Sequence, residues 1–433
     1  MTDWIGDTFT STTGWTHLQR LVDTPTRMAG SDGEREAAAA TRDALAQHAD
    51  DAWLDTFPVQ GWTRGDSAIE TPADTTADTI ALPRSPAGTA AGEFVDLGYG
   101  LPADFEDADL DGAIVMVAAD VPDWYDRHLH RREKYAHAVA AGAAGFVYMN
   151  HVAGCLPATG SVGTGDDPIG EIPAVGVSTE TGTRLSRRFE HDTVTLTVDA
   201  DTHDATSQNV HATLGPDTDA ELLVTSHVDA HDITDGAMDN GAGTAMAVEL
   251  ARILAARESA LDTRVHFVCF GAEEVGLVGS HHDAAQRDLD DVRAVLNLDG
   301  VVRERTLKLY THRFDALGDA ANAVSDTFAH PITVAPALNP HSDHWAYVKH
   351  GVPGYHATSD AAGGRGWGHT SADTLDKLEL RTFREHAILL AALAARLADD
   401  GFAVAHASEA DVAAGLTDAG LAEGMQITGD WPY

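Results

Sequence analysis

The feature that most constrains the fold is a series of short, almost wholly apolar runs separated by segments of helical pattern. The runs include ELLVTS at 221–226, RVHFVCF at 264–270 and RAVLNL at 293–298. Helical patterns lie near 242–257, 276–286 and 380–398. Strands that are apolar on both sides need cover on both faces of their sheet. The sequence therefore predicts an α/β fold with a mixed, mostly parallel sheet sandwiched by helices.

A change of composition near residue 66 indicates a second domain. The segment TPADTTADTIALPRSPAG is rich in Thr, Asp, Ala and Pro and has few helical signals. Strand-like runs follow at 113–118 and 145–149, and TVTLTV at 193–198 alternates as a half-buried strand does. We expect an inserted β-rich domain at 66–200, a discontinuous catalytic domain at 1–65 and 201–405, and a C-terminal extension at 406–433.

The charge balance narrows the choice of partners. The chain of 433 residues has 28 Lys+Arg against 68 Asp+Glu, a formal net charge of −40. Nucleic acids and anionic membrane surfaces would repel such a chain, so neither is expected as a partner. Lysine occurs only at Lys134, Lys308, Lys349 and Lys377. An acid excess along the whole chain with so little lysine is typical of halophilic proteins, in which concentrated salt screens carboxylate repulsion.

The sequence shows no sign of export or membrane insertion. The first residues, MTDWIGDTFTSTTGW, lack a basic segment and an apolar core, and no apolar run approaches the ~20 residues that span a bilayer. The two cysteines, Cys155 and Cys269, form no metal-binding pattern. We expect a soluble, cytoplasmic protein.

Chemically active side chains follow the apolar runs. His227 and Asp229 come after the first, Glu273 and Glu274 after the second, and Asp299 after the third. Two further candidates lie in glycine-rich loops, namely Asp239 in DGAMDNGAG and His369 in GWGHTSADT. Ligands of open α/β sheets bind beyond the carboxyl ends of the strands. These groups are therefore predicted to converge at one edge of the sheet.

Taken singly, each of these residues has an ordinary structural interpretation. A histidine after a strand is commonly a loop residue, Asp239 suits a helix cap, and adjacent glutamates often form a solvated turn. Taken together, imidazoles and carboxylates without a thiolate suit Zn(II), with Mn(II) or Co(II) as alternatives. Cations would also neutralise the mutual repulsion of the carboxylates. The constellation favours a metal site.

Several motifs between about residues 205 and 398 resemble the M28 family of dizinc exopeptidases, which includes aminopeptidases Y and S. In order, they are SHVDA, DGAMDNGAGTA, GAEEVGLVGS, LNLDG, SDHWAY and GHTSADTLDKL. The segment at 66–200, with DLDGAIVMV, AAGAAGFVYMN and IPAVGVS, resembles a protease-associated (PA) domain. In that family a PA domain is often inserted before the catalytic core, which is its place here.

The resemblance implies a role for each residue and two Zn(II) ions per chain. One ion would be bound by His227 and Asp299, and the other by Glu274 and His369. Asp239 would bridge the two ions. Asp229 would accept the free N–H of the His227 ring and fix its tautomer. Glu273 would be the general base of peptide hydrolysis.

The chain departs from the family at one point. Some members have a tyrosine that assists the oxyanion just before the SDH motif, whereas Asn339, Pro340 and His341 stand there in this sequence. His341 is either a substitute hydrogen-bond donor or a surface histidine. His344, within the motif, is expected to be structural.

The sequence favours an aminopeptidase acting on peptides but leaves other functions open. A carboxypeptidase needs cations for the C-terminal carboxylate, and Arg303, Arg305 and Arg365 are candidates. An acidic site would instead receive an N-terminal amine readily. A non-catalytic binding protein is the alternative from another class, but the retention of the implied base and all implied ligands argues against it.

Low ionic strength should destabilise the protein because the unscreened carboxylates repel one another. We expect the thermal unfolding midpoint to fall steadily as KCl is reduced from molar to millimolar concentration. Circular dichroism during heating measures this, with an uncharged osmolyte as the control for general solvent effects. A midpoint independent of salt would contradict the halophilic interpretation.

Overall fold

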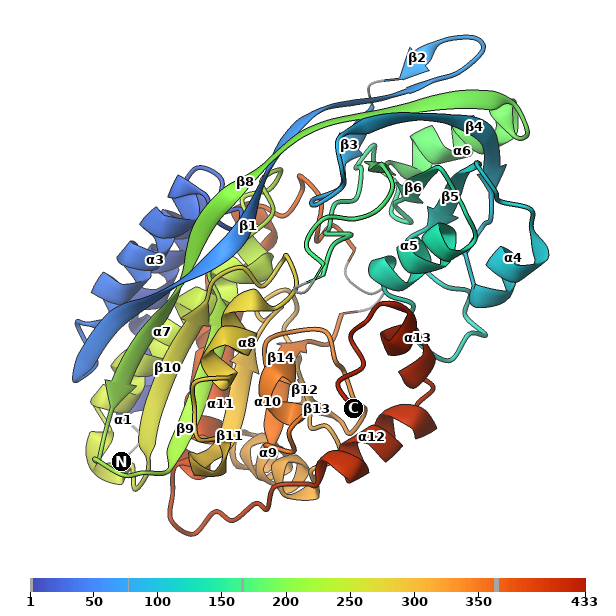
Figure 1. The fold of residues 1–433 in the computed structure, drawn as a ribbon. Helices are drawn as coiled ribbons and strands as arrows, with labels where there is room; N and C mark the ends of the chain where they lie inside the picture. Colours follow the sequence, from blue (N-terminus) through green and yellow to red (C-terminus); the bar gives the residue numbers. More distant parts are fainter. Residues whose placement is uncertain (1–2, 77, 165–166, 362–365) are drawn as a thin grey trace.

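The computed structural model describes residues 3–76, 78–164, 167–361 and 366–433, and it shows two α/β units joined by a long ribbon (Figure 1). The larger unit contains the sheet that was predicted from the apolar runs. Its order is β13-β12-β14-β11-β9-β10-β8. The strands are β8 (Thr193–Leu214), β9 (Glu221–His227), β10 (Arg264–Phe270), β11 (Val292–Leu298), β12 (Leu307–Tyr310), β13 (Ile332–Ala335) and β14 (Gly354–Ser359).

The centre of this sheet is parallel. β9 pairs in parallel with β10 and β11, and β11 pairs in parallel with β14. β8 and the pairing of β12 with β14 are antiparallel, so the sheet is mixed. Consecutive residues of β9 enter opposite cores, with Leu222 and Val224 on one side and Leu223 on the other. Burial on both faces explains the continuous apolar run, and the predicted fold class is confirmed.

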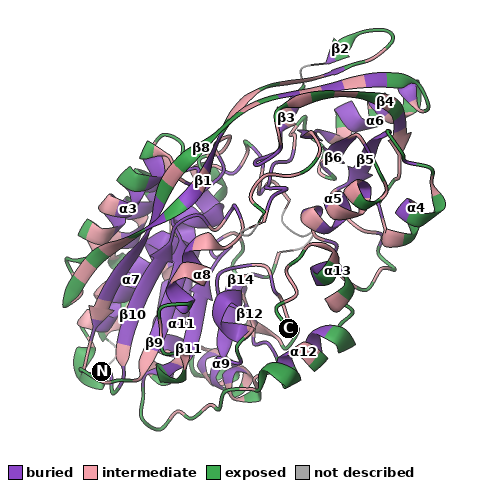
Figure 2. Cartoon of the chain, in the orientation of Figure 1, coloured by how far each residue is buried: buried purple, intermediate pink, exposed green. Residues whose placement is uncertain are grey.

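Helices cover both faces of the sheet (Figure 2). On one face α7 (Ala242–Ala255) packs beside α11 (Leu380–Leu397), α2 (Thr13–Val22) and α3 (Asp32–Leu45). α1 (Asp3–Thr10) and α9 (Asp315–Phe328) contact α11. On the other face lie α8 (Val278–Ala284) and α10 (Trp345–Val348), whose Ala284 and Tyr347 join the core around Leu223.

The ribbon that joins the units is longer than the sequence predicts. β1 (Asp51–Glu70) pairs antiparallel with β8 over almost its full length, whereas the sequence predicts a strand in β8 only at 193–198. The middle of β8, DADTHDAT, is polar and mostly exposed, so it has no apolar alternation to reveal it. Its backbone is satisfied by the partner strand, which allows a strand without a buried face.

β8 connects the strands of both units into one continuous order, and this positions the second unit. Its end, Val210–Leu214, pairs with β10, and its start, Thr193–Val198, pairs with β4 (Gly88–Asp96). From β4 the order continues through β5 (Ile114–Ala118), β6 (Gly145–Met149) and β7 (Ala174–Val177) to β3 (Thr79–Ala81). The helices of this unit are α4 (Pro102–Asp107), α5 (Arg131–Ala140) and α6 (Thr179–Phe189), and β2 (Thr75–Thr76) pairs with β1. The predicted domain limits at 65/66 and 200/201 fall inside β1 and β8 and stay predictions.

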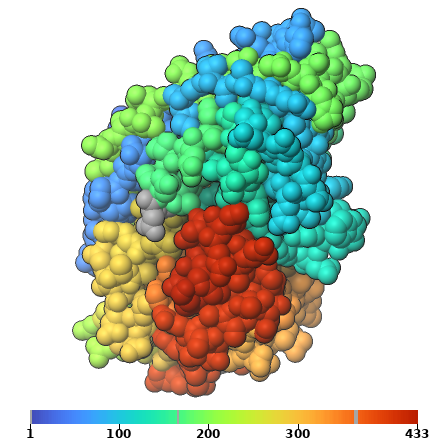
Figure 3. Space-filling view, turned by 45° about the vertical axis from the view of Figure 1, so that its right-hand side comes forward, coloured from blue at the N-terminus to red at the C-terminus, as the bar shows by residue number. Residues whose placement is uncertain are grey.

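The C-terminal extension contains two helices that the sequence did not reveal, α12 (Glu409–Asp418) and α13 (Ala422–Ile427). This segment lies across the front of the molecule, against the inserted unit (Figure 3). Arg132 of α5 forms an ion pair with Asp430 at 2.7 Å. The extension therefore ties the inserted unit to the larger one. None of the described helices is long and apolar enough to cross a membrane.

Buried histidines should make the stability of the fold sensitive to mild acid. His17 lies between α2 and α3, with Nε2 3.0 Å from Oγ1 of Thr41. Burial, helped by Arg20 and Arg27, lowers the pKa of His17 to about 4 from 6.5. The unfolded state therefore binds the proton more tightly than the folded state. The contribution of neutral His17 to the free energy of unfolding is complete above pH 6.5 and is lost as pH falls towards 4.

For His17→Gln we therefore expect the loss of unfolding free energy between pH 7 and pH 5 to be about 2 kcal/mol smaller than in the wild type. Denaturant unfolding at the two pH values measures the difference. The exposed His191→Gln is the matched control and should follow the wild type. An unchanged pH dependence in His17→Gln would show that His17 contributes nothing to acid sensitivity.

Candidate metal centre

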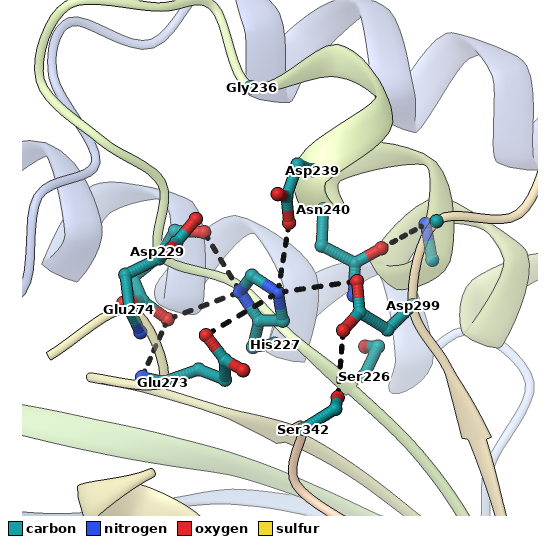
Figure 4. Close-up of polar contacts among 12 residues, drawn as sticks. Ser226, His227, Asp229, Gly236, Asp239, Asn240, Glu273, Glu274, Asp299 and Ser342 are labelled. Carbon is teal, nitrogen blue, oxygen red and sulfur yellow. Dashed lines mark hydrogen bonds and ion pairs between the residues drawn. The ribbon is translucent and has the colours of Figure 1, made fainter. Parts of the chain in front are cut away.

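The predicted site residues meet at the carboxyl ends of the central strands, as the position of each after an apolar run requires. His227 ends β9, Glu273 and Glu274 follow β10, and Asp299 follows β11. Asp239 lies in the turn that leads into α7, and His369 comes from the loop before α11. Figure 4 shows the carboxylates pointing at the His227 ring from several sides.

Among the residues that the structure describes, two groups of potential metal ligands meet here. In the first, His227, Glu273 and Asp299 each offer an atom, all within 4.8 Å of one another. Nε2 of His227 is 3.8 Å from Oδ1 of Asp299 and 4.0 Å from Oε2 of Glu273. In the second group, His231, Glu274 and His369 converge in the same way. The distances within the first group are longer than hydrogen bonds. Nε2 of His227 is buried without a hydrogen-bond partner among the described residues.

Asp239 stands between the two groups. Its Oδ1 is 3.4 Å from Nε2 of His227, and its Oδ2 is 3.1 Å from Nε2 of His369. The two oxygens of one carboxylate thus face the two groups separately. This geometry is the one that a bridging carboxylate needs.

Asp229 organises the loops around the first group. Its carboxylate accepts hydrogen bonds from the backbone N–H groups of Glu273 and Glu274, both at 3.1 Å. Its Oδ1 is also 3.4 Å from Nδ1 of His227, and its backbone oxygen is 3.2 Å from the same nitrogen. Asp229 therefore fixes both the His227 ring and the turn that carries the two glutamates.

An outer layer of buried groups holds the turn of Asp239. The carboxylate of Asp373 accepts from the backbone N–H groups of Met238 and Asp239, at 2.8 and 3.0 Å. The guanidinium of Arg27 donates to the backbone oxygens of Val228, Asp235 and Gly236. On the opposite side of the site, Oγ of Ser342 donates to Asp299 at 2.7 Å (Figure 4).

The electrostatics of the site are dominated by buried carboxylates. Burial raises the pKa of Glu273 well above its usual value, and the neighbouring acids Glu274, Asp343 and Asp299 add to this against the effect of His227. Burial also raises the pKa of Asp343 to about 8. The pKa of His227 is raised well above its usual value because the surrounding carboxylates outweigh its burial. Such a site favours positive charge at its centre.

The donor set fits divalent zinc. Imidazole nitrogens and carboxylate oxygens are both common zinc ligands, and zinc sites in proteins combine three or four of them. Burial lowers the pKa of the His231 ring, which favours the neutral imidazole that binds metals. The described residues thus offer two neighbouring groups of metal-binding atoms, with Asp239 between them.

Comparison with known proteins agrees with this geometry. Residues 209–394 match the model of peptidase family M28, and residues 76–185 match the PA domain. Residues 209–394 form a peptidase family M28 domain. The PA domain precedes it in the chain, in the order that the sequence motifs predict.

Relatives of the M28 domain and its PA insertion are aminopeptidases. Aminopeptidase YwaD of Bacillus subtilis is 28% identical over 309 residues, which is 68% of this chain and 64% of YwaD. The chain thus matches less than two thirds of the length of that relative. The structure of an aminopeptidase from Aneurinibacillus sp. strain AM-1 is similar, with a TM-score of 0.73 at 25% identity. The match covers 94% of this chain and 99% of that aminopeptidase. A zinc aminopeptidase from Bacillus subtilis has the same fold, with a TM-score of 0.69 at 22% identity. The match covers 90% of this chain and 95% of that protein.

The PA domain reaches the loops of the M28 site. Arg64 on the ribbon forms an ion pair with Asp232 at 2.5 Å, and the backbone N–H of Thr159 donates to the backbone oxygen of His369 at 2.8 Å. His341 lies against this domain and not in either ligand group, since its ring stacks on His130 at 4.9 Å. The ring of His344 is fully buried, and its Nε2 lies 2.7 Å from the backbone oxygen of Asn339.

Several residues of the M28 site were not predicted from the sequence. They are His231 in the second ligand group, and Arg27, Ser342 and Asp373 in the outer layer. His231 follows His227 by only four residues in the same loop, which is a signal that the sequence did carry. Arg27 belongs to the N-terminal segment, far from any motif, so only the fold places it here.

Proposed function

We propose that the protein is a metal-dependent aminopeptidase that hydrolyses the N-terminal residues of peptides at a site for two zinc ions. The observation that carries the proposal is the position of Asp239, whose two carboxylate oxygens face His227 and His369 separately. His227 and Asp299 would hold one ion, Glu274 and His369 would hold the other, and Asp239 would supply a carboxylate oxygen to each. Co(II) and Mn(II) suit the same donors.

Bound zinc supplies Lewis acidity for the scissile carbonyl and lowers the pKa of water at the site towards neutrality. Glu273 is the general base in this proposal. Its side chain is 13% exposed, so it reaches the open part of the site, while Asp229 anchors its backbone. It takes a proton from the attacking water and delivers it to the leaving amine.

The acidic surroundings favour an N-terminal amine over a C-terminal carboxylate. Of the arginines that could bind a carboxylate, Arg305 is exposed and forms an ion pair with Glu385 at 2.7 Å. Arg303 lies over the Trp367 ring, at 5.7 Å from its centroid. Arg365 lies outside the described residues. A carboxypeptidase remains an outcome of the test below.

The substrate class is tested by comparing the hydrolysis of two chromogenic compounds. One is a Leu- or Ala-linked compound with a free amine, and the other is its N-blocked analogue. In molar KCl we expect cleavage of the free amine only, loss of activity on chelation, and recovery when zinc is added. Cleavage of neither compound by protein that still binds metal would contradict the aminopeptidase proposal. C-terminal substrates would then be assayed.

Replacement of the base should separate catalysis from metal binding. We expect Glu273→Gln to retain both ions, because Glu273 is not needed as a ligand, while kcat falls by at least ~10²–10⁴-fold. Metal analysis and steady-state kinetics on the same preparation measure the two effects. The conservative Glu423→Gln in α13 is the control. Near-normal turnover in Glu273→Gln would remove Glu273 from the base role.

A further inference from the structure

His231 is a buried imidazole to which the family resemblance gives no role. It lies in the loop after β9, between His227 and Asp239, and only 1% of its surface is exposed. Its Nε2 is 2.9 Å from Oε2 of Glu274. Its ring meets that of His369 edge to face, with centroids 4.5 Å apart. His231 therefore faces Glu274 and His369, the two residues assigned to the second ion.

The short contact with Glu274 is not aligned as a hydrogen bond. Neither ring nitrogen of His231 has a partner with hydrogen-bond geometry in the part of the chain that the structure describes. Oε1 of Glu274 is also buried without a hydrogen-bond partner among the described residues. Buried polar atoms without partners cost free energy, so an arrangement like this needs an explanation. A cation bound by Nε2 of His231 and by the Glu274 carboxylate would give both groups a partner.

The spacing of the donor atoms agrees with a shared cation. Zinc–ligand bonds of about 2.0–2.1 Å in a tetrahedral arrangement separate neighbouring donor atoms by about 3.3 Å. Nε2 of His369 is 3.2 Å from Oε2 of Glu274 and 3.1 Å from Oδ2 of Asp239. With the 2.9 Å separation of His231 from Glu274, these distances are near the expected one.

The loop holds His231 in this place from both sides. The next residue, Asp232, forms an ion pair with Arg64 of the ribbon at 2.5 Å. The preceding Ala230 donates its backbone N–H to the backbone oxygen of Arg27 at 3.1 Å. An imidazole fixed in advance loses little conformational freedom on binding a metal, which is typical of a ligand.

We propose that Nε2 of His231 is a further ligand of the ion held by Glu274, His369 and Asp239. This inference rests on the proposed function, because it needs the two-ion site. The second ion then has two imidazoles and two carboxylates, a closed set typical of tightly held zinc. The ion at His227 and Asp299 has fewer protein donors and keeps room for substrate and water. The two halves of the site thus differ in role.

A positioning role is the alternative, in which His231 only donates a hydrogen bond to Glu274. His231→Gln separates the two, because the glutamine amide can donate to Glu274 but is a poor zinc ligand. Loss of a group that only orients a ligand typically weakens metal binding by about 10–100-fold. For His231→Gln and His231→Ala alike we expect the second ion to bind at least 100-fold more weakly, while the first is retained.

The direct test is His231→Cys loaded with Co(II). A thiolate bound to Co(II) gives an intense near-ultraviolet charge-transfer band that imidazole does not, so we expect this band in the variant and not in the wild type. His191→Cys is the matched control, because the His191 side chain is 70% exposed and the substitution adds a cysteine away from the site. Calorimetric titration with zinc gives the number of ions and their affinities for each protein.

The wild type provides a test that does not depend on the folding of any variant. X-ray absorption at the zinc edge should show three imidazoles shared by two ions, whereas the ligands implied by the family alone give two. Two imidazoles, absence of the band in folded Co(II)-loaded His231→Cys, or full affinity in His231→Gln would overturn the inference. A wild type that binds no zinc would instead refute the proposed function.

Discussion

The constraint on which the structure depends is the burial of many carboxylates at one edge of a parallel sheet. Burial disfavours the charged form of each, and the pKa values of Glu273 and Asp343 are raised accordingly. Arg27 supplies a buried positive charge, but its guanidinium is used on the backbone oxygens of the loops. Divalent cations are the compensation that the donor atoms fit. The carboxylates repel one another when no cation lies between them. The hydrogen bonds of the outer layer therefore hold these carboxylates in place against that repulsion.

The same edge is reached by the PA domain, and one strand explains how. β8 pairs with β10 of the M28 sheet at its end and with β4 of the other sheet at its start. Because hydrogen-bonded ladders fix register, the two sheets cannot slide relative to each other without breaking backbone pairs. The contacts Arg64–Asp232 and Thr159–His369 then join the PA side to the loops of both ligand groups.

The sequence predicts the parallel sheet and its polar strand ends because burial on both faces leaves continuous apolar runs. It does not predict the middle of β8, where DADTHDAT is held by pairing with β1 and not by a buried face. It also misses α12 and α13, which pack through a few residues such as Val412, Leu416 and Met425. The spacing of His231 from His227 is a hint in the sequence, but only the fold places Glu274 and His369, which are distant in sequence, beside it.

The net charge of −40 bears on how a substrate is recognised. In dilute solution so acidic a protein would attract a cationic N-terminus from a distance. In molar salt the Debye length is about 3 Å, so that attraction is lost beyond contact distance. Charges within the buried site are screened far less, because water and ions are excluded from between them. If the protein acts on a free amine in concentrated salt, as proposed, discrimination must come from groups that touch the amine, such as the carboxylates around Asp239 and Glu273.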